Sequence, residues 1–217
     1  MLSREAIVMT REISEQTVDL STRIIRPQSR WANRFVIAAI VQGALAAGLT
    51  AYFLYDSKYP QDSLDPGPAR IVAGGGAGTW LAMGYLAYII FGPLAIAVTS
   101  LFYQHIEVSM GAVYTRATNV LGWIHLVLMN VGVVGGTWLM MNGGYRGGAL
   151  AINLAKVTPA LTPGQIAGQV HVQVLSGLVD PIGYFALLAV LGAFAGGVGY
   201  VIAWRQAIKV PASRILR

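Results

Sequence analysis

Long stretches without a charged residue dominate the chain, and short charged or turn-rich segments separate them. The first stretch covers residues 35–55, and about 21 residues at about 1.5 Å of helical rise each cross the roughly 30 Å hydrocarbon layer of a bilayer. Three further stretches cover residues 71–106, 117–145 and 181–204. Because each is long enough for one spanning helix, the pattern predicts an all-α fold, an integral membrane four-helix bundle.

Turn and cap residues set the limits of the predicted spans at residues 35–55, 78–103, 117–142 and 181–204. Three glycines at positions 74–76 predict a turn before the second span, and Pro93 predicts a kink within it. The sequence Asn142-Gly143-Gly144 is typical of a helix C-terminus and predicts the end of the third span. Asp180-Pro181 combines an N-cap carboxylate with a first-turn proline and predicts the start of the fourth.

Amphipathic segments flank and connect the predicted spans. Residues 1–34 are expected to be a cytoplasmic segment with an amphipathic helix over residues 3–25, or else a solvated charged tail. A second amphipathic helix is predicted over residues 163–179, where Thr162 and Gln165 form a capping box, and we expect it to lie in the outer membrane interface or to form a lid. Residues 205–217 are predicted to be a basic cytoplasmic tail.

The distribution of lysine and arginine predicts the orientation. Four spans place both termini on one side, and that side carries eleven of the 15 cationic residues, against four on the other. Cytoplasmic segments carry an excess of Lys and Arg. Both termini are therefore expected in the cytoplasm of a multi-pass plasma-membrane protein. Contact with anionic lipids then accounts for the net charge of +6.

The composition excludes several classes of protein. Of the 217 residues, 55% are hydrophobic and 11% are charged, against about 25% charged residues in an average soluble domain. The absence of cysteine excludes thiolate metal sites and cysteine nucleophiles. Basic and aromatic residues do not alternate in a soluble module, so nucleic acid is not expected as a partner. No Asp, Glu, Lys or Arg lies inside a predicted span, and no G-x-S-x-G motif is present, so the chain is not expected to catalyse a reaction by itself.

Small and aromatic residues predict how the spans pack and where they end. Small residues occur on every span and predict closely packed helices. The aromatic residues near the span ends are expected to be interfacial anchors rather than a binding cage; they are Trp31, Trp80, Trp123, Trp138, Trp204, Tyr55 and Tyr103.

His125 is the strongest candidate for a functional side chain. It lies roughly 13 Å inside the predicted third span, and a histidine within hydrocarbon indicates a functional site by default. It shares one helix face with Gly122, Met129, Gly132 and Gly136. Two interpretations follow: this face holds a haem or another flat group, or it forms an ordinary helix crossing in which His125 bonds a carbonyl or hydroxyl group of the next helix.

The other histidines limit the haem interpretation. A bis-histidine haem needs two imidazoles at similar depth on neighbouring helices. His105 is expected at the cytoplasmic end of the second span and His171 in the outer helix, so neither lies level with His125. Met129 is a second candidate cofactor contact, although one turn along the same helix it cannot take the opposite axial position. Any haem or quinone is therefore expected to be shared with a partner subunit, and no metal site is expected.

One segment resembles a known family. The sequence WIHLVLMNVG at residues 123–132 resembles the histidine-bearing helices of haem-copper oxidases and nitric oxide reductases, and the likeness covers about 25 of the 217 residues. The catalytic subunit of that superfamily has several more intramembrane histidines and many more spans, whereas this chain offers His125 alone. The resemblance therefore implies a small accessory subunit of a terminal oxidase or a related electron-transfer complex.

The leading hypothesis is a non-catalytic integral membrane subunit of a larger respiratory electron-transfer complex of the terminal-oxidase type. It would stabilise the assembly or shape a groove for lipid, quinone or another cofactor, with other integral membrane subunits and lipids as partners. One alternative is a b-type cytochrome completed at a subunit interface. The other is a small oligomeric transporter or channel whose neutral polar path is lined by Gln42, Asn119, His125, Asn130 and Thr137.

Overall fold

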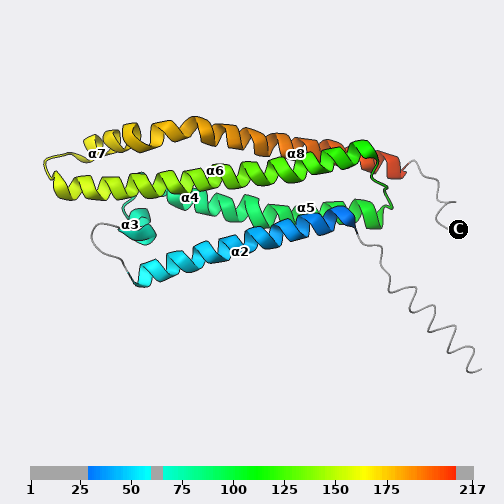
Figure 1. Cartoon of the computed structure of the whole chain (residues 1–217), viewed down its shortest axis with the longest axis horizontal. Helices are drawn as coiled ribbons and strands as arrows, with labels where there is room; N and C mark the ends of the chain where they lie inside the picture. Colours follow the sequence, from blue (N-terminus) through cyan, green and yellow to red (C-terminus); the bar gives the residue numbers. More distant parts are fainter. Residues whose placement is uncertain (1–28, 60–65, 209–217) are drawn as a thin grey trace, which may run out of the picture.

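The structure is a computed structural model, and it describes residues 29–59 and 66–208. The predicted amphipathic helix over residues 3–25 and the tail residues 209–217 lie outside the described residues. Within the described ranges the chain forms helices and short connections without any β-strand (Figure 1), which confirms the predicted all-α fold.

Four helical segments within these ranges are long and apolar enough to cross a membrane, in agreement with the predicted number of spans. The first is α2 (Arg30–Lys58). A short helix, α3 (Gly67–Ala73), precedes the second, which comprises α4 (Gly78–Ile89), the π-helical turn η1 (Ile90–Leu94), α5 (Ala95–Gln104) and the π-helical turn η2 (His105–Ser109). The third is α6 (Arg116–Val157). The fourth comprises α7 (Pro163–Val170), the π-helical turn η3 (His171–Leu175), the 3-10 turn η4 (Ser176–Leu178) and α8 (Val179–Ile208).

Successive spans run in opposite directions. The start of α2, the connection between η2 and α6, and the end of α8 therefore lie at one end of the bundle, here named the terminal end (Figure 1). The end of α2, the helix α3 and the turn between α6 and α7 lie at the opposite end, here named the far end.

Local sequence signals account for the limits of these helices. The side chains of Ser29, Thr115 and Thr162 accept hydrogen bonds from first-turn backbone N–H groups, and Thr162 completes the predicted capping box with Gln165. Gly75 and Gly76 have φ values of 65° and 54°, which glycine tolerates best, and form the predicted turn before α4. Pro93, where a kink is predicted, lies within η1.

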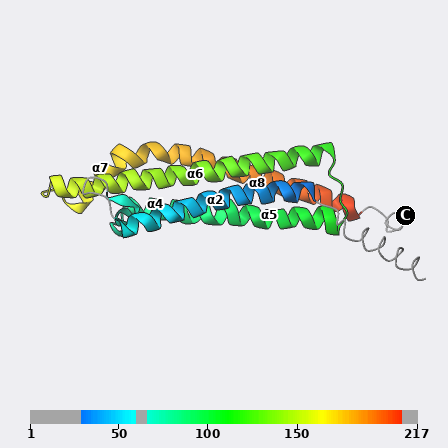
Figure 2. The ribbon, with the colours of Figure 1, turned by 60° about the horizontal axis from the view of Figure 1, so that its bottom comes forward.

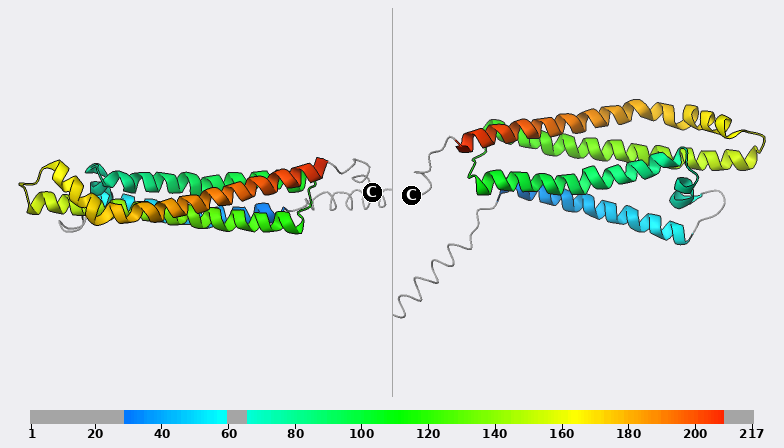
Figure 3. Two further views of the ribbon diagram at one scale, coloured as in Figure 1. Left: turned by 90° about the horizontal axis from the view of Figure 1, so that it is seen from above. Right: turned by 180° about the vertical axis from the view of Figure 1, so that it is seen from behind.

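The four spans form two pairs, α6 with α8 and α2 with the second span, and α6 joins the pairs through α4. Helix α6 packs against α8 on one side and α4 on another, while α2 packs against α5 and η1. Views from several directions show α6 beside α8 and α2 beside α4 and α5 (Figures 2 and 3). Because α8 rests chiefly on α6 and meets the second span mainly through η2, the side of the bundle between α5 and α8 is not closed.

The third span is longer than the sequence predicts. Asn142-Gly143-Gly144 does not end it, and α6 continues to Val157 over 42 residues. These glycines are contact sites within the helix: Gly144 lies against the backbone of Leu81 on α4, and Gly148 lies against the side chain of Ile71 on α3. A helix of this length extends for about 63 Å at the usual rise, roughly twice the hydrocarbon thickness of a bilayer.

The segment over residues 163–179 also differs from the prediction of a separate interfacial helix. Its helical path continues through η3 and η4 into α8, and the buried side chains Val170 and Leu175 pack near Gly147 of α6. The start of α8 at Val179, with Asp180 in its first turn, agrees closely with the predicted start of the fourth span. The end of α6 and the helix α7 form a helical hairpin that extends past the other helices at the far end (Figure 1).

Candidate functional site

His125 lies in the interior of the bundle, where four helices meet. Its side chain is buried, and Nδ1 lies 3.1 Å from the hydroxyl oxygen of Tyr103 on α5, forming a hydrogen bond. Its ring lies 5.0 Å from the ring of Phe35 on α2, measured between centroids. Gly196 of α8 lies against the same ring. Side chains or backbone from α2, α5 and α8 therefore fix the position of the imidazole on α6.

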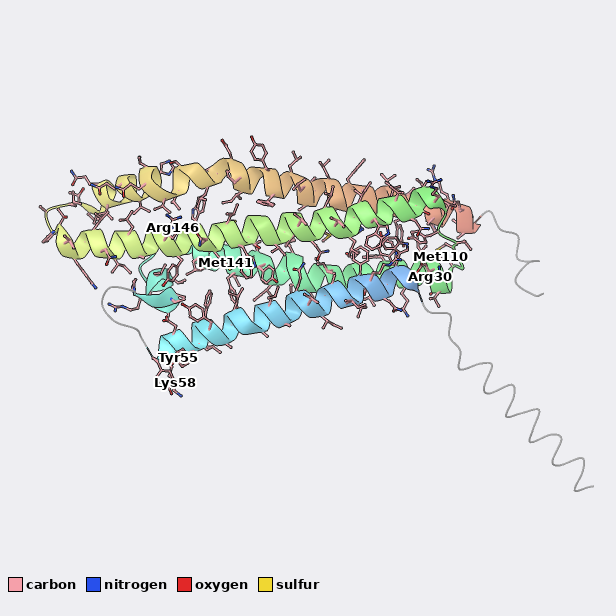
Figure 4. All side chains as sticks on the ribbon, in the orientation of Figure 1. Arg30, Tyr55, Lys58, Met110, Met141 and Arg146 are labelled. Atoms are coloured by element: carbon pink, nitrogen blue, oxygen red, sulfur yellow. The ribbon has the colours of Figure 1, made fainter. Side chains whose placement is uncertain are left out.

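His125 belongs to an aromatic cluster at the terminal end. Phe35 stacks on Tyr103 with ring centroids 4.8 Å apart, and the ring of Trp31 lies 5.8 Å from that of Tyr103. The side chains of this end crowd the region near the labelled Arg30 (Figure 4). Aromatic pairs at such separations add to the stability that burial alone provides.

Two predicted interfacial anchors are core residues instead. Trp31 is 1% exposed and Tyr103 is 4% exposed. Trp31 can enter the core because Gly122 leaves room for its indole ring and because its Nε1 atom donates a hydrogen bond of 2.9 Å to Asn119 Oδ1. Burial of an indole is tolerated when its N–H group finds a partner in this way.

The face of α6 that contains His125 meets different neighbours along its length. Gly122 lies against the Trp31 ring, whereas Gly132 lies against the backbone of α8 at Ala189. These neighbours fill the space beside both glycines, so the residues of this face do not fit a haem lying along it within a single chain. The hydrogen bond from His125 to a hydroxyl group of a neighbouring helix is the arrangement described by the helix-crossing interpretation.

A groove borders His125 on the open side of the bundle. A hollow of about 450 Å³ lies between α5 and α8, and His125, Tyr103 and Tyr200 contribute to its lining. A second hollow of about 390 Å³ adjoins it toward the far end and is lined by residues that include Gly132 and Thr137. The two share Met129 and Ala193, and together they are named the lateral groove. Each has the size of a small-molecule site, roughly 300–1,000 Å³.

The candidate cofactor contact Met129 lies at the junction of the two hollows. It also packs against the buried cluster of Trp31, Phe35 and Tyr103. The structure thus places both candidate residues, His125 and Met129, on the wall of the lateral groove.

A second polar contact lies deeper in the bundle. Gln42 on α2 is buried, and its Nε2 atom donates a hydrogen bond to Asn130 Oδ1 on α6. Asn130 Nδ2 donates to the Leu126 carbonyl at 2.6 Å, and the Tyr88 hydroxyl donates to the backbone carbonyl of Gln42 at 3.3 Å. The Gln42 Oε1 atom is buried without a hydrogen-bond partner among the described residues. This amide pair joins α2 to α6 between the aromatic cluster and the far end.

The polar residues proposed to line a channel are engaged in local contacts. Asn119 bonds Trp31 and the Tyr114 carbonyl, and the Thr137 hydroxyl donates to the Val133 carbonyl one turn earlier on α6. Gln42 and Asn130 bond each other. These groups therefore join neighbouring helices or their own helix, and their bonds do not link them into one polar path.

A carboxylate organises the connection at the terminal end. Glu107 in η2 accepts hydrogen bonds from the Ser29 hydroxyl and from the backbone N–H of Trp31, at the start of α2.

Tyr114, in the linker before α6, has a buried hydroxyl. Burial, with the neighbouring Tyr103 and Glu107, raises the pKa of Tyr114 above its usual value, so this hydroxyl stays neutral.

The remaining histidines lie apart from His125, as the sequence predicts. His105 begins η2 and His171 begins η3, and both are exposed. No cluster of three or more His, Cys, Asp or Glu side chains suited to a metal occurs in the part of the chain that the structure describes.

Sequence reasoning missed Tyr103, Gly196 and Phe35 as neighbours of His125. A signal for two of them exists in the chain. Trp31, Phe35 and Gln42 recur at helical spacing on α2, as do Tyr88, Ile96 and Tyr103 on the second span, and all six are buried.

Comparison of the chain with protein-family models, with curated proteins and with solved structures finds no match.

Proposed function

We propose that the chain is a non-catalytic integral membrane subunit of a larger respiratory electron-transfer complex, and that its lateral groove holds an isoprenoid quinone. The observation that carries the proposal is the lateral groove itself, in which the apolar hollow lined by Gly132 and Thr137 adjoins the hydrogen-bonded pair of His125 and Tyr103. An isoprenoid quinone likewise combines a long apolar tail with one polar ring.

The hydrogen-bonded pair suits both redox forms of a quinone head group. When the Tyr103 hydroxyl donates to Nδ1, the proton of the neutral imidazole lies on Nε2, which can donate to a quinone carbonyl. When Nδ1 carries the proton and donates to the Tyr103 oxygen, Nε2 can accept from a quinol hydroxyl. His125, a residue of the groove wall, can therefore match either form through a change of tautomer.

The apolar hollow of the lateral groove suits the isoprenoid tail. Its lining is almost entirely apolar, and the exposed side of the groove opens between α5 and α8. Small residues on α6 and α8 leave space in this hollow. They are Gly132 and Gly136 on α6, and Ala189 and Ala193 on α8. A flexible hydrocarbon chain binds by burying apolar area and needs no directed polar partner.

The spans support a binding role rather than independent turnover. No carboxylate, lysine or arginine lines either hollow of the lateral groove, so no side chain of these charged types lies beside a quinone held there. Electrons would come from a partner subunit. Large apolar residues exposed along α8, such as Leu187 and Phe194, offer a surface to lipid or to that partner. In the topology predicted from the sequence, the side of both termini carries eleven of the 15 cationic residues, which favours cytoplasmic termini in a plasma membrane.

The proposal is tested by measuring quinone in the isolated protein. The chain is purified from native membranes in mild detergent, quinone is extracted and quantified per chain, and co-purifying subunits are identified. Ala193→Phe fills the groove at the junction of its two hollows, and should lower the quinone content at least roughly fivefold. Leu187→Phe adds the same ring to α8 outside the groove and should leave the content unchanged. Quinone at the level of bulk membrane lipid, or equal retention by both variants, contradicts the proposal.

A further inference from the structure

Arg34 on α2 is held between two tryptophan rings. Its guanidinium carbon lies 4.4 Å from the ring centroid of Trp31 and 4.7 Å from that of Trp123 on α6. The rings of Trp31 and Trp123 meet edge to face, with centroids 5.6 Å apart. Trp31 is itself fixed by its hydrogen bond to Asn119. The position of the guanidinium is therefore set by the protein before any ligand arrives.

No ion pair joins Arg34 to a carboxylate within the described part of the chain. Only three carboxylates occur there, Asp56, Glu107 and Asp180. Asp56 lies at the end of α2 remote from Arg34, and Asp180 lies at the start of α8. Glu107 is at the same end as Arg34, but it accepts hydrogen bonds from Ser29 and from the Trp31 amide.

Two further guanidinium groups lie on the same side of the terminal end. Arg30 precedes Arg34 by one helical turn on α2, and Arg116 precedes Trp123 by two turns on α6, so each shares a face with its partner. Both arginines are exposed. These three cations therefore outnumber the one described carboxylate at this end, that of Glu107.

An apolar surface continues from this cationic region toward the bundle centre. On α2, Ile37 is 62% exposed and Val41 is 55% exposed, and both follow Arg34 on one helical stripe. On α6, Val127 follows Trp123 in the same way and is also exposed. A molecule that combines a phosphate group with an acyl chain would fit both the arginine region and this apolar surface.

We propose that Arg34, with Arg30 and Arg116, binds the phosphate of an anionic phospholipid whose acyl chains lie on the α2–α6 surface. Arginine presents paired N–H groups that match phosphate oxygens, and tryptophan is favoured at the level of the lipid head groups. In the topology predicted from the sequence, the side of both termini carries eleven of the 15 cationic residues and faces the cytoplasmic leaflet, where anionic lipids concentrate. Trp123 and His125 lie about 160° apart around α6, on nearly opposite faces, so this site is separate from the lateral groove.

Lipid-dependent stability tests the proposal. The thermal unfolding midpoint of the purified full chain is measured in neutral detergent with added phosphatidylglycerol, with phosphatidylcholine, or with inorganic phosphate. Phosphatidylglycerol should raise the midpoint at a concentration at least roughly tenfold lower than phosphatidylcholine requires. Equal responses to the two lipids would show that the head-group charge is not recognised, and the same response to inorganic phosphate would show that no lipid is needed. Either result overturns the proposal.

Substitutions locate the effect. Arg34→Gln should abolish the preference for phosphatidylglycerol, and Arg34→Lys should retain part of it because the charge remains without the planar fork. Arg205→Gln removes an exposed arginine near the end of α8 and should keep the full preference. If Arg34→Gln proves too unstable to purify, Trp123→Leu tests the same site, since it removes one of the two rings that hold Arg34. An unchanged preference in Arg34→Gln, or in Trp123→Leu when it is used, contradicts the assignment.

Discussion

Gly196 on α8 lies so close to the imidazole of His125 on α6 that a methyl group at position 196 would overlap the ring. The ring cannot turn aside freely, because its Nδ1 atom is hydrogen-bonded to Tyr103 and its other neighbours include Phe35. This contact joins the helix that carries the candidate site to the helix that forms one wall of the lateral groove.

We expect Gly196→Ala to push α8 away from α6 and to weaken the hydrogen bond of His125. Overpacking of a closely packed site costs about 1–3 kcal/mol, which exceeds the gain of about 1 kcal/mol or less from higher helix propensity. The variant should have a lower thermal unfolding midpoint in detergent. Gly197→Ala is the matched control, because a methyl group at position 197 meets no atom within 4 Å. A midpoint for Gly196→Ala at or above that of Gly197→Ala would refute this packing.

We expect Gly144→Ala to be more damaging still. The added methyl group would meet the backbone of Leu81 on α4, and backbone atoms can move only if the whole helix shifts. Gly183→Ala on α8 places the same group in open space. Thermal unfolding of both variants in the same detergent checks the difference. An unfolding midpoint for Gly144→Ala equal to that of Gly183→Ala would contradict the close approach of α4 to α6.

The amide pair of Gln42 and Asn130 should show energetic coupling. Removing either partner leaves the buried Gln42 or the half-buried Asn130 without this hydrogen bond, at a cost of roughly 1 kcal/mol, and removing both should cost less than the sum of the two single changes. A double-mutant cycle with Gln42→Ala and Asn130→Ala measures the coupling from unfolding free energies. Asn142→Ala, at an exposed position on the same helix, should be additive with Gln42→Ala. Additivity in both cycles would mean that the hydrogen bond contributes no stability.

The orientation can be measured without removing any native thiol, because the chain has no cysteine. Ser57 and Ser109 are exposed and lie at opposite ends of the bundle. In intact cells, a membrane-impermeant maleimide should label Ser57→Cys, whereas Ser109→Cys should react only after permeabilisation. The unmodified chain serves as the unlabelled control. The reverse pattern would place the termini outside, and labelling of both positions in intact cells would contradict four spans.

The number of spans could be predicted because charge-free runs of sufficient length are a property of the sequence alone. The internal contacts of the glycines could not. Gly143 and Gly144 carry the same local signal whether they end a helix or admit a neighbouring one, and only the position of α4 beside Gly144 decides between the two. The same holds for the segment after Thr162, whose capping box marks where a helix begins but not where that helix leads.

The candidate site was predictable in part for a similar reason. A histidine in an apolar span is conspicuous, so His125 and the neighbouring Met129 could be named in advance. Tyr103 lies close to a span end, where tyrosine is usually an anchor, and only the approach of α5 to α6 brings its hydroxyl to the imidazole. Trp31 enters the core because Gly122 on another helix leaves space for it, and that relationship between distant residues has no local signature.

The uninterrupted course of α6 has a mechanical consequence. The helix that positions His125 also forms the outermost hairpin at the far end, without a proline or a π-turn between them. A straight helix resists bending over this distance, so a tilt imposed at Val157 is transmitted along its axis to the imidazole and its contact with Gly196. Docking of another protein onto the hairpin would in this way adjust the width of the lateral groove beside His125.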